Sequence, residues 1–119
     1  TFGDLSNQTG DKLDAHELVR NKALEQMGCA KGLRMNANPS IATPRSQHVN
    51  IHRIESDLSK TYLGTNGKNE FQFGLDGKPT KQQMDVWQGA LRKSGIGAAQ
   101  ARRLRKRSAK FLKNLCCNC

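Results

Sequence analysis

The first regular alternation of apolar and polar positions runs over residues 15–27 and predicts a helix. Four apolar residues recur there at the three- and four-residue spacing of one helical face: Val19, Ala23, Leu24 and Met27. Asp14 and Glu17 stand in the positions of a capping box before this face, and Gly28 follows it as a helix stop.

Three more helices are expected further along the chain. One opens at Pro44 and extends to about Leu58, one follows Thr80 and ends before Gly95, and the last spans about 98–115. The segments without helical spacing are a loop over 28–44 with an extended piece at 40–43, a tight turn at 64–68 and a short strand at 71–73.

This pattern predicts a mainly α fold with a little β. The 119 residues, of which 35% are hydrophobic, suffice for one small single domain. Because the chain opens with Thr1 and a polar, glycine-containing stretch, we expect a linker from a larger protein over 1–12, the domain over 13–115 and a cysteine-rich terminus over 116–119. No run approaches the roughly 20 apolar residues that cross a bilayer, so no membrane-spanning segment is expected.

The chain carries a net charge of +10, and its second half is the more basic one because no acidic residue follows Asp85. Such an excess attracts polyanions by releasing their counterions, which predicts contact with nucleic acid. The residues expected to make this contact are Arg92, Lys93, Arg102, Arg103, Arg105, Lys106 and Arg107. The alternative is a solvated helix face that only aids solubility.

The four cysteines are Cys29, Cys116, Cys117 and Cys119. A disulfide framework distributes its cysteines through a chain, and a zinc site usually draws on two separated pairs. The spacing therefore favours a reactive terminus over either arrangement.

All three histidines lie within residues 16–52. Imidazole is the commonest transition-metal ligand and titrates near neutrality. His48 and His52 are one helical turn apart, so both can face one ion. The alternatives are structural: Glu17 closes a capping box, Asn38 starts a turn, and His52 is a surface residue.

Four short motifs, in their order and spacing, resemble the C-terminal toxin domains of bacterial polymorphic toxins. The motifs are Asp14-Ala15-His16-Glu17, Gly28-Cys29-Ala30-Lys31-Gly32, Asn38-Pro39-Ser40-Ile41-Ala42 and His48. Those domains belong to the HNH/endonuclease VII group of nucleases, the His-Me finger or ββα-metal class. The resemblance covers about residues 11–55, and the basic tail matches less well.

The resemblance implies a ββα-metal core, followed by C-terminal helices, that binds a divalent ion (Mg, Mn, Ni or Zn). His16 with Glu17 corresponds to the paired positions that open the HNH motif, one binding metal and the other acting as general base. Because many relatives have a second His where this chain has Glu17, the base stays unassigned between these two residues. Asn38 resembles the asparagine that orients the base, His48 would be the closing metal ligand, and His52 would assist. The pattern itself does not reveal the implied strand pair.

The resemblance further implies a nuclease toxin that is delivered into a competing bacterium at the end of a large secreted protein and acts in its cytoplasm. A dedicated immunity protein would protect the producer, and its face should be acidic to meet this charge. Three functions stay open: a metal-dependent DNase, which we expect, a metal-independent ribonuclease acting on tRNA, and a basic module that binds nucleic acid without cleaving it.

Overall fold

The structure, a computed structural model, describes residues 13–29 and 37–115. The expected linker 1–12 and the cysteine-rich terminus 116–119 lie outside these ranges. Within them the chain is mainly helical, with a two-stranded sheet and four α-helices in one domain. The expected fold class is confirmed.

The sheet pairs β1 (Leu13–Glu17) with β2 (Ser40–Pro44) in antiparallel register, and His16 lies opposite Ile41. β2 runs directly into α3 (Arg45–Leu58). Pro44 forms the junction, where a helix start needs no backbone N–H and tolerates proline. Two antiparallel strands are thus followed at once by a helix that contacts both of them.

The helix expected over 15–27 is wrong in its first part. Residues 13–17 form β1, and only Asn21–Gln26 are helical, as α2, which ends before Gly28 in the left-handed region (φ 93°). The capping box therefore does not form. Because residues 13–17 pair with β2 through backbone hydrogen bonds, a partner distant in sequence outweighs the local helical spacing.

The second half follows the expected helices closely. α3 continues into a π-helical turn (Ser59–Leu63), α4 spans Lys81–Lys93, and α5 spans Ala98–Asn114. Thr80 caps α4, its side-chain oxygen accepting from the backbone N–H of Gln83. The strand expected at 71–73 is wrong, because Phe73 makes only an isolated bridge with Pro79.

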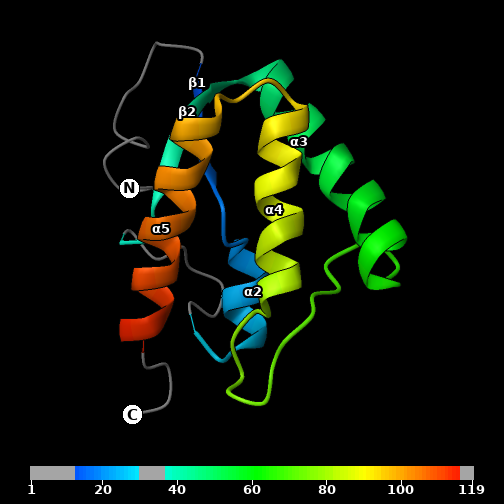
Figure 1. Cartoon of the computed structure of the whole chain (residues 1–119), viewed down its shortest axis with the longest axis vertical. Coiled ribbons are helices and arrows are strands. Elements are labelled where there is room, and N and C mark those ends of the chain that lie inside the picture. Colours follow the sequence, from blue (N-terminus) through cyan, green and yellow to red (C-terminus); the bar gives the residue numbers. More distant parts are fainter. Residues whose placement is uncertain (1–12, 30–36, 116–119) are drawn as a thin grey trace.

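The core forms around α4, which lies between α3 and α5 and contacts both (Figure 1). Its Trp87 and Leu91 are fully buried, as are Ile51 of α3 and Leu104 of α5. The strands contact α3, and Leu18 and Leu24 add buried apolar side chains from the N-terminal segment. None of the helices in the described ranges has the length and apolar character required to cross a bilayer.

Candidate metal centre

The three histidines meet at one point of the fold. His16 comes from β1, and His48 and His52 come from the first turns of α3. The ring centroids lie 5.0 Å apart for His16 and His48, 5.4 Å for His16 and His52, and 4.5 Å for His48 and His52. One ring nitrogen of each lies within 4.8 Å of one nitrogen of each of the others, so the cluster could hold a metal ion.

The order of elements places these rings together. The pairing of β1 with β2 sets His16 beside the strand that leads into α3, and the direct junction at Pro44 brings the first turns of α3 next to that strand. His48 and His52 then share one face of α3 because they are four residues apart. Their convergence with His16 was predicted, although we expected His16 on a helix.

Burial leaves several imidazole nitrogens without partners. His16 is 1% exposed, and within the described residues neither of its ring nitrogens has a hydrogen-bond partner. The same holds for Nδ1 of His48 and Nδ1 of His52. Leaving a buried polar group unsatisfied costs about 1–3 kcal/mol. A cation shared by the three rings would remove part of this cost, so the residues fit a metal.

The cluster keeps His48 neutral. Burial, and then the nearby His16 and His52, lower the pKa of His48 to about 4, with a smaller opposing effect from Asp14. Its Nε2 lies 2.6 Å from Nε2 of His52. Metal ligation requires a neutral imidazole, and His48 is in this form throughout the neutral range.

An ion pair between a buried carboxylate and a partly exposed arginine, which the sequence analysis missed, lies against the cluster. Glu55 of α3 is 3% exposed, and its Oε2 accepts a hydrogen bond from Nη1 of Arg20 at 2.7 Å. Oε1 of Glu55 lies 3.5 Å from Nε2 of His16, and Oε2 lies 3.7 Å from Nδ1 of His52. Burial raises the pKa of Glu55, but the two histidines and Arg20 outweigh it and lower this pKa to about 2.

Glu17 and Asn38 form a separate buried contact. Nδ2 of Asn38 donates to Oε2 of Glu17 at 2.8 Å and to the carbonyl of Val19 at 2.9 Å. Asn38 is fully buried, so it fixes both this carboxylate and the end of β1. The amide of Asn38 thus contacts Glu17, one of the two candidates for the general base.

The histidines border a small hollow of about 170 Å³. The residues that line it are Ala15, His16, Glu17, Arg20, Asn21, Lys22, His48 and His52. Both members of the predicted pair, His16 and Glu17, therefore face this space, together with two cationic side chains. The arrangement can hold a cation and receive an anion beside it.

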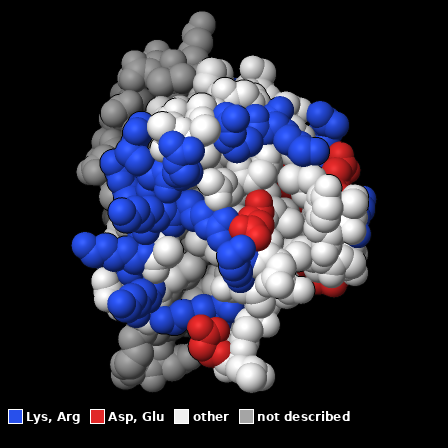
Figure 2. Space-filling model, viewed as in Figure 1, with Lys and Arg blue, Asp and Glu red and all other residues white. Residues whose placement is uncertain are grey.

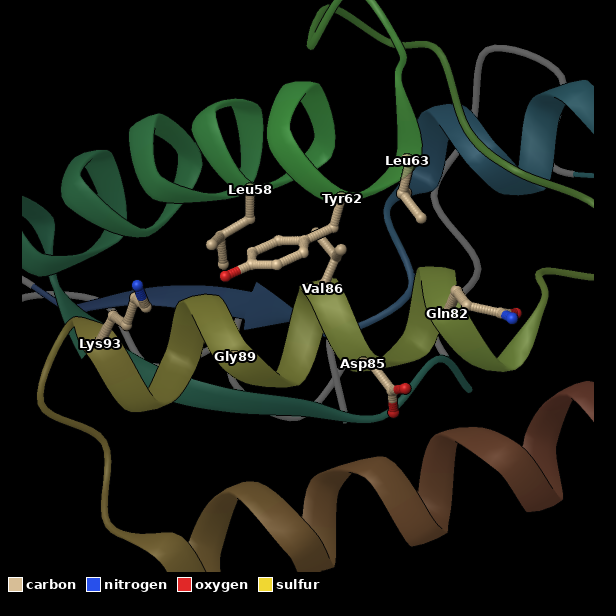
Figure 3. Close-up of a pocket in the computed structure, with 8 residues that line it drawn as sticks. All are labelled: Leu58, Tyr62, Leu63, Gln82, Asp85, Val86, Gly89 and Lys93. Atoms are coloured by element: carbon tan, nitrogen blue, oxygen red, sulfur yellow. The ribbon is translucent and has the colours of Figure 1, made fainter.

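A larger, apolar groove of about 400 Å³ lies elsewhere, between α4 and the end of α3 with its π-helical turn (Figure 3). Leu58 and Tyr62 line one side of it, and Val86 and Gly89 of α4 line the other. None of the three histidines borders this groove. The larger hollow is therefore distinct from the candidate metal centre.

The predicted basic surface is formed by α4 and α5, and Lys and Arg side chains gather over α5 in Figure 2. The expected residues that are exposed are Arg92, Lys93, Arg102, Arg103, Lys106 and Arg107. Arg105 is only half-buried, donates to Asp85 and Gln88, and thereby joins α5 to α4. Nη1 of Arg92 donates to the carbonyl of Ile96 at 2.8 Å.

The cysteines differ in part from expectation. Cys29 is buried and is disulfide-bonded, which the cysteine spacing did not predict. Cys116, Cys117 and Cys119 lie outside the described residues.

No family model, no curated protein and no solved structure matches the chain. The functions and residue roles implied by the resemblance therefore remain predictions.

Proposed function

We propose that this domain is a metal-dependent endonuclease that cleaves phosphodiester bonds, with DNA as its substrate. The observation that carries the proposal is the convergence of His16, His48 and His52, drawn from a strand and a helix, beside a hollow that also contains cationic side chains. The paired strands β1 and β2, which α2 separates in the chain, and α3 directly after β2 are consistent with the ββα core that the resemblance implies.

His16, His48 and His52 would hold the ion. An all-imidazole donor set suits zinc or nickel better than magnesium or manganese, which prefer oxygen ligands. A bound divalent ion would polarise the phosphodiester and stabilise charge on the leaving oxygen.

The chain's own residues supply the remaining functions. Arg20 and Lys22 border the hollow and would bind the phosphate oxygens, and the five N–H donors of Arg20 allow it to hold Glu55 and a phosphate together. Glu17 would be the general base that takes a proton from water, oriented by the hydrogen bond from Asn38. We assign Glu17 rather than His16 because His16 belongs to the group of three imidazoles that would hold the ion.

The charge of +10 supports substrate binding through the exposed basic face of α5. We propose, as the resemblance implies, that the domain acts as the C-terminal part of a secreted toxin in the cytoplasm of a competing bacterium. An immunity protein with an acidic face would neutralise it.

One contact favours a second candidate, a metal-independent ribonuclease. Nε2 of His48 lies 2.6 Å from Nε2 of His52, a distance at which two imidazoles share a proton. A neutral imidazole can activate the 2′-hydroxyl of RNA without an ion.

The test is a digest of plasmid DNA and total RNA, side by side, with magnesium, manganese, nickel or zinc and with a chelator. Cleavage should require the ion and be lost in His48→Ala, while Val49→Ala on the same helix, whose side chain is exposed, keeps full activity. Glu17→Gln should lose activity about 10²- to 10⁴-fold but bind the ion as before. Undiminished DNA cleavage in chelator would exclude the metal, and cleavage of RNA alone in chelator would establish the ribonuclease.

A further inference from the structure

Glu55 is a buried carboxylate to which the proposed cleavage assigns no part, yet it contacts two of the three histidines. Its Oε1 lies 3.5 Å from Nε2 of His16, and its Oε2 lies 3.7 Å from Nδ1 of His52. Arg20 also fixes the carboxylate through the hydrogen bond of 2.7 Å to Oε2. Glu55 is therefore held at a defined place between the cation of Arg20 and two ring nitrogens.

A neutral imidazole carries one proton, on either Nδ1 or Nε2, and a carboxylate favours the proton on the nitrogen that faces it. Because Nε2 of His16 lies in ion-pair range of Glu55, we expect this nitrogen to carry the proton and Nδ1 to keep the lone pair. In His52 the facing nitrogen is Nδ1, so Nε2 keeps the lone pair. The carboxylate thus selects opposite tautomers in the two rings.

The contact between His48 and His52 adds a consequence for the third ring. If Nε2 of His52 has the lone pair, then Nε2 of His48, which lies 2.6 Å away, must donate a proton to it in the metal-free chain. For His48 to bind a cation through Nε2, this proton has to leave and Nδ1 has to gain one by exchange with water. Binding through Nε2 would therefore change the tautomer of His48, whereas His16 and His52 would keep theirs.

We propose that Glu55 is the positioning residue of the metal centre: its carboxylate presents Nδ1 of His16 and Nε2 of His52 to a divalent cation. This inference rests on the metal centre of the proposed function, but not on nuclease activity. Carboxylates that orient ligating imidazoles in this way typically contribute 10- to 100-fold to metal affinity.

The first test needs no variant. Long-range ¹H–¹⁵N correlation spectra of the whole ¹⁵N-labelled chain, recorded near neutral pH in chelator and then with zinc, report the tautomer of each histidine. We expect protons on Nε2 of His16 and Nδ1 of His52 in both states, and a change at His48 when zinc is added. A proton on Nδ1 of His16 or on Nε2 of His52 in the metal-free chain would overturn the proposal.

The second test compares two carboxylates of the same helix. Glu55→Gln removes the buried charge, and Asp57→Asn removes an exposed one that pairs with Arg53. By isothermal titration with zinc, Glu55→Gln should bind 10- to 100-fold more weakly than the parent chain, and Asp57→Asn should bind equally well. Equal zinc affinity of the parent chain and a folded Glu55→Gln contradicts the proposal. If circular dichroism shows that Glu55→Gln is unfolded, the tautomers of the parent chain decide alone.

Failure of this inference and failure of the proposed function give different results. If the tautomers and zinc affinities are as expected but the chain cleaves no nucleic acid, the role of Glu55 stands and the nuclease proposal is rejected. If the chain cleaves DNA but Glu55→Gln binds zinc as tightly as the parent chain, the nuclease proposal stands and the role of Glu55 is rejected.

Discussion

The two halves of this domain place their charged and polar groups differently. The strand–helix half comprises β1, α2, β2 and α3, and the helical half comprises α4 and α5. The strand–helix half encloses its polar chemistry: His16, Glu17, Asn38 and Glu55 are all buried, and they contact one another or Arg20. The helical half encloses mainly apolar side chains, such as Trp87 and Leu104, and leaves most of its arginines and lysines exposed.

This difference predicts where a substitution lowers the stability of the fold most. Buried charged and polar groups depend on specific partners, because each loses its hydration and is stabilised only by its neighbours in the fold. Exposed charges keep their hydration, so they act through their number and position rather than through single contacts. Removing a partner of a buried charge, as in the first half, should therefore have a large effect, and removing an exposed charge in either half should have a small one.

The largest expected effect on folding comes from the buried ion pair. Arg20→Gln leaves Glu55 as a buried carboxylate without its guanidinium, and the free energy of unfolding should fall by about 3 kcal/mol. Arg53→Gln, which removes the exposed partner of Asp57 on the same helix, should cost less than about 1 kcal/mol. Urea denaturation in chelator measures both values, and equal losses would remove the distinction between buried and exposed charges.

An intermediate effect, on binding rather than folding, is expected from the basic face of α5. The combined change of Arg103, Lys106 and Arg107 to glutamine should weaken binding to duplex DNA about 10- to 100-fold. The slope of its salt dependence should fall by about 0.9 for each phosphate that the variant no longer neutralises. Fluorescence anisotropy at several salt concentrations measures both. Zinc affinity should stay unchanged, and a concurrent loss of zinc binding would show that the two surfaces are not independent.

The smallest effect concerns the ion pair between α4 and α5. The hydrogen bond from Arg105 lowers the pKa of Asp85, against the opposing effect of burial. The ion pair therefore stabilises the fold at pH values above the ordinary pKa of this carboxyl, 3.8, and this contribution is lost as the pH falls below that value. Because Asp85 is 48% exposed, Asp85→Asn should cost less than about 1 kcal/mol near neutrality.

Thermal unfolding from neutral to acidic pH checks this last expectation. The difference between Asp85→Asn and the parent chain should shrink as the carboxyl becomes protonated. A difference that grows on acidification would mean that the charge of Asp85 does not stabilise the helix pair.

Local patterns were sufficient where an element is defined by its own sequence. α4 begins after Thr80 and α5 spans 98–114 as expected, because apolar residues at helical spacing and a capping side chain are properties of the segment itself. Local patterns were insufficient at β1, where Asp14 and Glu17, in the positions of a capping box, suggested that the helix already began at residue 15. The strand becomes visible only when its partner, 40–44, is known.

The same division holds for the candidate site. The four-residue spacing of His48 and His52 predicted that they share a helical face, and the order of the motifs predicted that His16 joins them. Glu55 was missed although it lies three residues after His52, within reach on the same helical face, and attention to this spacing could have found it. Arg20 gave no local indication, because its ion pair crosses 35 positions of the chain.

The net charge, the helical second half and the shared helical face of His48 and His52 follow from residue type and short spacing alone. The fold places His16 on a strand, sets its ring centroid 5.0 Å from that of His48, and joins Glu55 and Arg20 in an ion pair beside them. Strand pairing and desolvated ion pairs join residues that are distant in sequence, and only folding brings these residues together.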